Sequence, residues 1–262
     1  MSAVGPEDPS AIAAISALAR TPRLLVALDF DGTLAPLVDE PMNARMTPDA
    51  ADAVDALLDA PDTAVAFVSG RTLHDLRIIA EHDDDSPVLL AGSHGAEQWP
   101  PVEASPDDAA DRALRDELRA RAEEIAGRAE GAWIEPKEFG FALHTRLAGD
   151  GAPDVQDAVD ALVADRAPAW RRRAGRDILE FAFRQEGKDA AVERLRAETG
   201  ATAVLFAGDD VTDEDALRSL RPGDVGVRVG AGETAASVRV ADIAELAALL
   251  ARLAHERGAA RE

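Results

Sequence analysis

The stretch Leu24-Leu25-Val26-Ala27-Leu28-Asp29-Phe30-Asp31-Gly32-Thr33-Leu34 joins five apolar residues to two carboxylates, a glycine and a hydroxyl. Five apolar residues in a row need cover on both faces, which predicts a central strand of a parallel sheet. Asp29 and Asp31 then lie at the carboxyl end of the strand, where open α/β sheets bind ligands. Strand alternation points both carboxylates the same way and Phe30 away. Such a pair disfavours double ionisation unless a cation lies between the two or one keeps a proton.

Further apolar runs alternate with helical patterns on both sides of this stretch. Strands are predicted at residues 63–68, 88–91, 203–207 and 224–229. Helices are predicted to start at Pro48 and near Thr212, and to span residues 72–81, 188–198 and 243–255. Apolar strands separated by helices are typical of a doubly wound parallel sheet, so the predicted fold class is α/β.

Residues 99–183 interrupt this pattern. The segment from Trp99-Pro100-Pro101 to Pro106 is rich in proline and marks a domain boundary. After it come helices at 107–129 and 155–165, and strand pairs at 132–135 with 141–146 and 169–173 with 177–183. The alternating strand and helix pattern resumes at Gly187. We therefore predict a core of residues 1–98 and 184–262, with an inserted α+β domain of residues 99–183.

Composition limits the functions that the chain can have. Its 262 residues include 50 acidic and 28 basic ones, which gives a formal net charge of −22. So acidic a chain is repelled by nucleic acid and by anionic membranes, and we expect neither as a partner. The absence of cysteine excludes disulfides, thiolate metal sites and a thiol nucleophile. The sequence shows neither a signal-peptide pattern nor an apolar run of membrane-spanning length, so a soluble, cytoplasmic protein is expected.

Polar side chains follow three of the predicted strands. Asp29 and Asp31 follow the first, and Ser69 with Gly70 follows the second, where a helix N-terminus would add N–H donors for an anion. Three more carboxylates follow strand 203–207, namely Asp209, Asp210 and Asp213. Clustered carboxylates suit Mg²⁺, which binds through few protein oxygens plus a phosphate.

Lys188 is the expected cation of this group. Lysine occurs only at Lys137 and Lys188, and Lys188 opens a predicted helix, from which it would act as a point charge on phosphate. Each feature also has a plainer explanation. Ser69-Gly70-Arg71 would be only a helix start, Lys188 a solvated first-turn residue, and Asp210 and Asp213 acids that favour a helix N-terminus. Their joint occurrence at strand ends favours a site.

Several motifs occur together in this order: Asp29-x-Asp31-Gly32-Thr33, Ser69, Lys188 and Gly208-Asp209-Asp210-x-x-Asp213. With them the chain resembles the haloacid dehalogenase (HAD) superfamily of phosphotransferases. Further motifs make it similar to the trehalose-6-phosphate phosphatase family over residues 23–240. These are Leu34 with Pro36 and Pro41, Ser69-Gly70-Arg71, His94-Gly95-x-Glu97, Glu135-x-Lys137, His144-x-Arg146, Glu180 and Thr212-Asp213-Glu214-Asp215.

The resemblance implies a HAD-like core, a cap formed by the inserted domain, and a covalent mechanism. Asp29 would attack phosphorus to form a phosphoaspartyl intermediate, while Asp31 would protonate the leaving sugar and then activate water. Ser69 and Lys188 would hold the phosphoryl oxygens. Mg²⁺ would be the cofactor, held by the Asp29 side chain, the Asp31 carbonyl and Asp209, with Asp213 or Asp210 in support.

The same resemblance implies the substrate contacts. Hydroxyl groups of the sugar would meet seven residues: Arg71, His94 and Glu97 from the core, and Lys137, His144, Arg146 and Glu180 from the cap. His144 would otherwise be a half-buried hairpin residue, and Arg146 a solvated strand end. Functional coupling to a trehalose-phosphate synthase is the protein partner that the resemblance suggests.

The chain departs from the family pattern in two places. It reads Phe183-Arg184-Gln185-Glu186-Gly187-Lys188-Asp189 where the family has a proline and Lys-Gly, and it has Thr145 where an aromatic residue is common. The alternatives are therefore a capped phosphatase for sucrose or mannosylglycerate phosphates, and a non-catalytic module that binds a sugar phosphate or regulates a synthase. Loss of the nucleophile or the lysine would indicate the non-catalytic module, and the sequence retains both.

Overall fold

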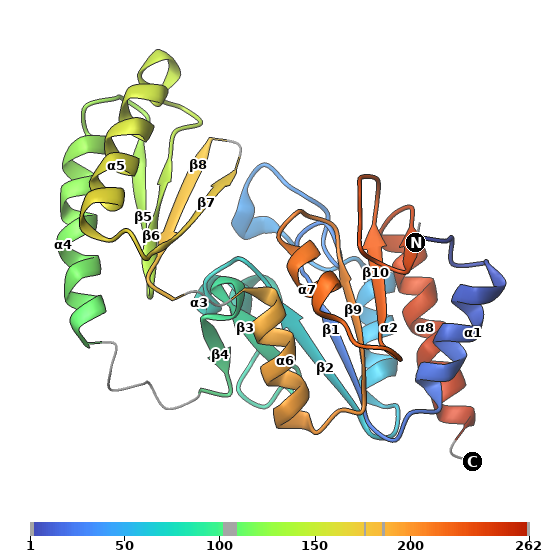
Figure 1. The fold of residues 1–262 in the computed structure, drawn as a ribbon. Helices are drawn as coiled ribbons and strands as arrows, with labels where there is room; N and C mark the ends of the chain where they lie inside the picture. The colour runs from blue at the N-terminus through green and yellow to red at the C-terminus, as the bar shows by residue number, and fades with distance from the viewer. Residues whose placement is uncertain (1–2, 102–108, 176, 185–186, 261–262) are drawn as a thin grey trace. The chain divides into compact units, whose positions relative to one another are not determined.

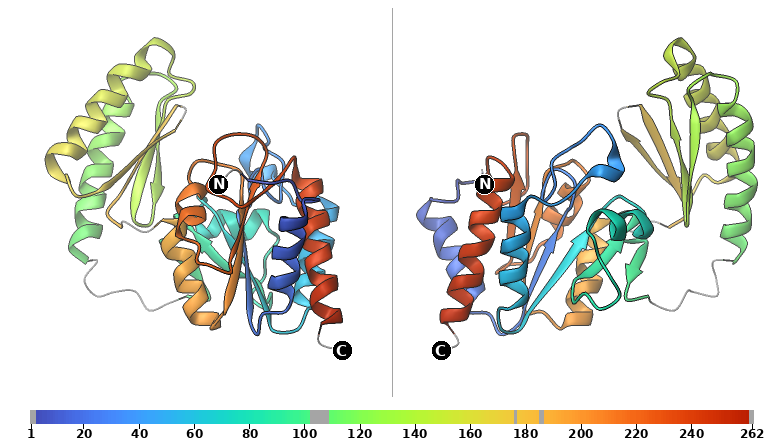
Figure 2. Two further views of the ribbon diagram at one scale, coloured as in Figure 1. Left: turned by 45° about the vertical axis from the view of Figure 1, so that its right-hand side comes forward. Right: turned by 180° about the vertical axis from the view of Figure 1, so that it is seen from behind.

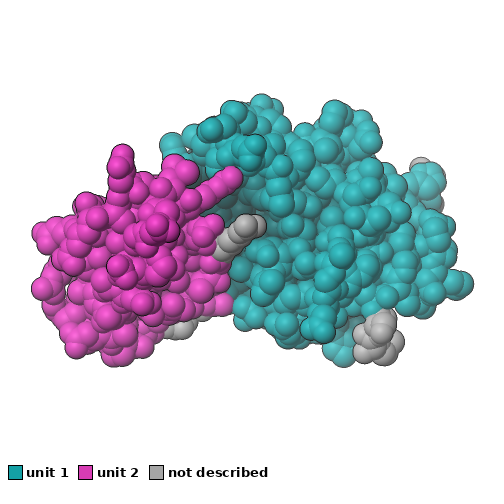
Figure 3. Space-filling model, turned by 90° about the horizontal axis from the view of Figure 1, so that it is seen from above, with its two compact units in different colours: residues 1–101, 186–262 teal, residues 102–185 magenta. Residues whose placement is uncertain are grey.

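A computed structural model describes residues 3–101, 109–175, 177–184 and 187–260 of the chain. The chain divides into two compact units, one of residues 1–101 and 186–262 and one of residues 102–185, coloured separately in Figure 3. The inserted unit expected from the sequence spans 99–183, and its function as a cap stays a prediction. No helix among the described residues has both the length and the apolar character needed to cross a bilayer.

The first unit is built on a mixed sheet with β1 at its centre (Figure 1). The described strand order is β11-β10-β9-β1-β2-β3-β4, and each neighbouring pair is parallel except β3 with β4. The strands are β1 (Leu24–Leu28), β2 (Thr63–Val68), β3 (Leu89–Gly92), β4 (Glu97–Trp99), β9 (Ala203–Gly208), β10 (Val225–Val229) and β11 (Val238–Val240). All five residues of β1 are buried, so the predicted central parallel strand and the α/β class are confirmed.

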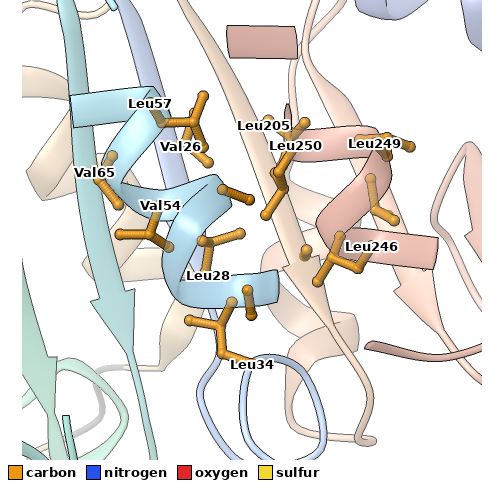
Figure 4. Close-up of a cluster of buried hydrophobic side chains, with 14 of the residues drawn as sticks. Val26, Leu28, Leu34, Val54, Leu57, Val65, Leu205, Leu246, Leu249 and Leu250 are labelled. Carbon is orange, nitrogen blue, oxygen red and sulfur yellow. The ribbon is translucent and has the colours of Figure 1, made fainter. Parts of the chain in front are cut away.

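Helices cover both faces of this sheet because β1 has apolar side chains on both. Leu24, Val26 and Leu28 join a core cluster with α1 (Pro9–Ala19), α2 (Pro48–Leu58) and α8 (Ile243–Ala259), of which Figure 4 shows a part. Leu25 and Ala27 join a second cluster with α6 (Lys188–Thr199) and α7 (Asp213–Ser219). Figure 2 shows α1, α2 and α8 grouped together, apart from α6. The short helix α3 (Leu73–Ile79) follows β2, and 3-10 turns occupy Pro41–Asn43 and Ser93–Gly95.

The second unit is an antiparallel sheet with helices on one face. Its strand order is β5-β6-β8-β7, formed by β5 (Trp133–Lys137), β6 (Gly140–His144), β8 (Ile178–Ala182) and β7 (Arg171–Gly175). Helices α4 (Ala109–Ala126) and α5 (Ala152–Arg166) pack on Phe141, Leu143 and Phe181, and a 3-10 turn at Gly149–Gly151 precedes α5. The other face is the one that α4 and α5 leave uncovered, and we call it the uncovered face.

Most predicted elements are present, with ends shifted by a few residues. Strand β2 has the predicted bounds, and the predicted helix 155–165 begins earlier, at Ala152. Two strands were not predicted, β4 and β11, and each has three residues. Three residues are too few to show the alternation by which strands are recognised. The last residue of β4, Trp99, is also the first residue of the segment that we interpreted as a boundary.

The side chain of Arg257 links the C-terminal helix α8 to the sheet by hydrogen bonds. Its side chain is fully buried, which guanidinium groups tolerate only when their donors are satisfied. It donates to the carbonyl oxygens of Leu18, Ala19, Thr21, Pro61 and Asp62 and to the hydroxyl of Thr63, at 2.6–3.4 Å. The guanidinium group of Arg257 therefore joins α8 to the end of α1 and the start of β2.

Arg257→Lys is expected to lower the free energy of unfolding by about 1–3 kcal/mol, because an ammonium cannot reach carbonyls on both sides. Urea denaturation followed by circular dichroism measures this. Arg252→Lys is the matched control, since Arg252 lies on the same helix and pairs with Glu256 at a partly exposed position. It is expected to change stability by less than about 0.5 kcal/mol. Equal effects of the two substitutions would contradict this account of Arg257.

Candidate active site

Lys188 and Asp29 form the centre of the site. Asp29 follows the last residue of β1, and its N–H donates to the carbonyl of Ala207 on β9 at 2.9 Å. Lys188 is the first residue of α6 and is 2% exposed. Its Nζ lies 2.6 Å from Asp29 Oδ1 and 2.7 Å from Asp213 Oδ1. The interpretation of Lys188 as a solvated first-turn residue is therefore wrong.

Asp213 has two roles at once. Its Oδ1 accepts from Lys188, while its Oδ2 accepts from the N–H groups of Asp209 and Asp210 at 3.0 and 2.9 Å. The second role holds the loop between β9 and α7 in a tight turn against a carboxyl group that is fully buried. Asp213 thus fixes both the lysine and the position of Asp209.

Three carboxylates are close enough to share one metal ion. An oxygen from each of Asp29, Asp209 and Asp213 lies within 4.8 Å of the others. Glycine makes this approach possible, because a Cβ on Gly32 would lie 2.1 Å from an oxygen of Asp209, and Gly32 has a φ of +78°. Two predicted ligands are not among these three carboxylates. Asp210 has an exposed side chain, and Asp31 was expected to contribute its backbone carbonyl, which a group of carboxylate oxygens does not include. Both stay predictions.

The electrostatics of the group call for a cation. Burial raises the pKa of Asp29 well above its usual range, and Asp213 and Asp209 raise it further, while Lys188 opposes them. Burial also raises the pKa of Asp209, with Asp213 adding to the effect. Burial alone would lower the pKa of Lys188, but Asp29 and Asp213 outweigh it and raise that pKa. Three carboxylates thus face one ammonium, and a bound divalent ion would relieve their repulsion.

Asp31 is paired with an arginine. Arg71 donates from Nε to Asp31 Oδ2 and from a terminal nitrogen to Asp31 Oδ1, both at 2.6 Å. Such a two-point bond holds the carboxylate in one orientation. Arg71 was predicted to contact the sugar, and in this structure its side chain is engaged by Asp31. No sequence pattern indicates this pair, whose members lie 40 residues apart.

Ser69 is buried at the end of β2, and its Oγ accepts from the N–H of Arg71 at 3.2 Å. The helix does not start there, because α3 begins at Leu73 with Thr72 as its N-cap. The predicted helix after this turn is therefore present within a residue of its predicted start, and Ser69-Gly70-Arg71 precede its N-cap rather than forming its first turn. Two N–H groups of the first turn of α3 have side-chain acceptors, since that of Leu73 donates to Glu97 and that of Asp75 donates to the hydroxyl of Thr72.

His94 and Glu97 support the neighbouring turn. The N–H of His94 donates to the carbonyl of Ser69 at 2.9 Å, and its buried ring lies against Gly70, where a Cβ would come within 2.7 Å. Glu97 accepts from the N–H of Leu73 at 3.1 Å and from the hydroxyl of Ser93. Both residues thus shape the turn that carries Ser69, and their predicted contacts with sugar stay predictions.

Three of the four cap candidates lie on the uncovered face of the second unit. Lys137 Nζ lies 3.3 Å from Glu180 Oε2, and His144 Nε2 lies 2.8 Å from an oxygen of Glu135. Arg146 is exposed and follows the end of β6, so strand alternation does not assign it to this face. The predicted sugar contacts of all four residues stay predictions.

Sequence reasoning missed residues that position the site. Arg228, inside the apolar strand β10, donates to the carbonyl of Asp210 at 2.8 Å and lies 3.5 Å from Glu214, which in turn accepts from the N–H of Ala235 at 2.8 Å. An arginine among valines in a buried strand was the available signal. On the second unit, Trp133 and Arg173 share the uncovered face with Lys137.

Comparison with known proteins gives a consistent result. A family model described as trehalose-phosphatase matches residues 27–244. A trehalose-6-phosphate phosphatase of Escherichia coli is 30% identical over 230 residues, which are 83% of this chain and 82% of that protein. A trehalose-phosphate phosphatase of Mycobacterium avium is 35% identical over 210 residues, which are 76% of this chain and 52% of that protein. A Mycobacterium tuberculosis protein described as an uncharacterized glycosyl hydrolase is 37% identical over 223 residues, or 79% of this chain and 16% of that protein. The chain thus spans only part of these mycobacterial relatives.

Solved structures share the fold. The C-terminal domain of Candida albicans trehalose-6-phosphate phosphatase has a TM-score of 0.76 and 21% identity, covering 97% of this chain and 98% of that chain. The C-terminal domain of a Candida albicans trehalose synthase regulatory protein has a TM-score of 0.66 and 15% identity. The match covers 87% of this chain and 93% of that chain. With a family model that spans most of its length, the chain belongs to the trehalose-phosphatase family.

Proposed function

We propose that this protein hydrolyses trehalose 6-phosphate to trehalose and phosphate through a covalent intermediate on Asp29. The observation that carries the proposal is the buried Lys188, whose ammonium bridges Asp29 and Asp213 at the carboxyl end of the central strand. A buried lysine costs stability unless it is paired, and here it is paired with the predicted nucleophile. Membership of the family supports the choice of substrate.

Mg²⁺ is the proposed cofactor, and the residues fit it. The ligands would come from Asp29, Asp209 and Asp213 side chains, whose oxygens lie within 4.8 Å of one another, and from the Asp31 carbonyl. Bound there, the ion supplies positive charge that lets an anionic carboxylate approach an anionic phosphate.

The chain's own groups carry the reaction in two steps. A carboxylate oxygen of Asp29 forms a bond to phosphorus as the bond from phosphorus to the sugar oxygen breaks, and Asp31 gives that oxygen a proton. Asp31 then takes a proton from water, which attacks phosphorus and releases phosphate from Asp29. Lys188 and Ser69 would hold the phosphoryl oxygens throughout. Because Asp31 is paired with Arg71 in this structure, its pairing must open before it can serve as the acid.

Two alternatives remain distinct from this proposal. A capped phosphatase for sucrose phosphate or mannosylglycerate phosphate would use the same core and a different sugar contact. The fold by itself is compatible with a regulatory domain, since the C-terminal domain of a Candida albicans trehalose synthase regulatory protein shares it. The pairing of Asp29 with Lys188 argues against that reading, since an inactive domain has no need to bury this pair. Functional coupling to a trehalose-phosphate synthase belongs to the proposal as its partner.

A phosphate-release screen tests the proposal. The panel consists of trehalose 6-phosphate, sucrose 6-phosphate, mannosylglycerate phosphate, glucose 6-phosphate and p-nitrophenyl phosphate, each with MgCl₂ or with EDTA. We expect the highest kcat/KM with trehalose 6-phosphate, and loss of phosphate release in EDTA. A different best sugar phosphate would overturn the substrate assignment, and no release from any compound would favour the regulatory alternative.

A further inference from the structure

Trp133 occupies an unusual place in the second unit. The other aromatic side chains of its sheet, such as Phe141 and Phe181, are buried against α4 and α5. Trp133 lies instead on the uncovered face and is 50% exposed. A large apolar ring is normally buried, so its exposure at the edge strand β5 calls for an explanation other than core packing.

The indole of Trp133 is held in a fixed orientation. His144 is its register partner on β6, and the two rings stack with centroids 4.2 Å apart and planes 5° from parallel. His144 Nε2 in turn donates to a carboxylate oxygen of Glu135 at 2.8 Å, which fixes the imidazole. The indole is therefore oriented before any ligand arrives, so that ordering it costs little on binding.

The residues beside Trp133 combine small side chains with charges of both signs. Strand β6 presents Gly140 and Ala142 on this face, and both are buried. The neighbouring strands add two carboxylates and three cations to this face. Lys137 Nζ lies 3.3 Å from Glu180 and 4.0 Å from Glu135, Arg173 lies 3.8 Å from Glu180, and Arg171 is placed on the same face by the register of β7 with β8. The paired charges offer both acceptors and donors.

This chemistry fits a neutral polyhydroxylated ring. The C–H face of a hexose is apolar and suits an aromatic plane, while its hydroxyls donate to carboxylates and accept from ammonium or guanidinium groups. A phosphate group alone has no apolar face to place on the exposed indole. An apolar peptide is disfavoured because it would bury these charges without satisfying them.

We infer that Trp133 is a specificity-determining residue that stacks on a hexose ring of the substrate, with His144 and Glu135 as the positioning residues that orient its indole. The inference rests on the proposed function and assigns a contact that the family motifs do not include. It also changes the role expected of His144, from a direct contact with sugar to the support of the aromatic plane.

Kinetics with two substrates test the inference. The quantity measured is the ratio of kcat/KM for trehalose 6-phosphate to kcat/KM for p-nitrophenyl phosphate, which has no sugar. Trp133→Ala is expected to lower this ratio about tenfold or more, mainly through KM for the sugar phosphate, and Trp133→Phe to restore part of it. Trp170→Phe is the matched control, because Trp170 packs on the helix-covered face.

Fluorescence supplies a readout that does not depend on turnover. Trehalose 6-phosphate is titrated into Asp29→Asn protein, whose three tryptophans are Trp99, Trp133 and Trp170. We expect a saturable change in emission that is lost with Trp133→Phe and kept with Trp170→Phe. An unchanged kinetic ratio in Trp133→Ala, or equal effects of the two phenylalanine variants on emission, would overturn the inference.

A different result would contradict the proposed function. If wild-type protein releases phosphate from p-nitrophenyl phosphate but not from trehalose 6-phosphate, the proposed substrate is wrong whatever Trp133 does. The ratio and the titration are then measured with the best sugar phosphate of the screen, and the same outcomes decide the role of Trp133.

Discussion

Asp29→Asn is expected to lower the rate of phosphate release by at least about a thousandfold and, in the absence of metal, to raise thermal stability. The loss of rate follows from the mechanism, since an amide oxygen is a poor nucleophile toward phosphorus. Release is measured with trehalose 6-phosphate and Mg²⁺. Turnover by the Asn variant close to that of the wild type would exclude the covalent mechanism.

The gain in stability follows from the raised pKa of Asp29. A carboxyl whose pKa is higher in the folded state binds its proton more tightly there, so stability falls as the pH rises from the usual carboxyl range through the raised pKa. The asparagine has no charge to bury beside Asp209 and Asp213. In EDTA, the melting temperature of the variant is therefore expected to exceed that of the wild type more at pH 8 than at pH 5.

Mg²⁺ provides the control for this comparison. An ion that binds only the folded protein stabilises it in proportion to the logarithm of its concentration over Kd. Mg²⁺ should therefore raise the melting temperature of the wild type more than that of Asp29→Asn. If the variant melts below the wild type in EDTA at both pH values, the buried charge of Asp29 does not destabilise the metal-free fold.

The sequence predicted those site residues that belong to a recognisable local pattern, such as a carboxylate directly after a buried strand. Five apolar residues before Asp29 placed that carboxylate at the end of a central strand, because only a fully covered strand tolerates such a run. The scarcity of lysine drew attention to Lys188 before its position was known. Glycine at Gly32 belonged to the motif, although the reason for it, the close approach of Asp209, appears only in three dimensions.

The sequence did not predict contacts between side chains that lie on different strands. Arg71 was expected to contact the sugar, and its pairing with Asp31 depends on the distance between the ends of β1 and β2. The stack of Trp133 on His144 depends on the register of β5 with β6, which a turn of one more residue would shift. Arg228 reaches the Asp210 carbonyl from another strand, so no local pattern revealed it.

Lys188→Met is expected to lower the free energy of unfolding of the metal-free protein by about 3–5 kcal/mol and to abolish phosphate release. Methionine has a similar volume, so the change removes the charge without opening a large cavity. It leaves Asp29 and Asp213 buried without their shared cation, whose bonds to them are 2.6 and 2.7 Å long. Urea denaturation in EDTA measures the loss.

A double-mutant cycle identifies the cause of that loss. If uncompensated charge is responsible, Asp29→Asn should stabilise the Lys188→Met protein more than it stabilises the wild type, because the lysine no longer offsets the carboxylate. Mg²⁺ should also raise the melting temperature of Lys188→Met more than that of the wild type, since the ion takes over the missing positive charge. Strictly additive effects of the two substitutions would instead mean that Lys188 stabilises the fold through packing alone, and that its ammonium is not what holds the carboxylates together.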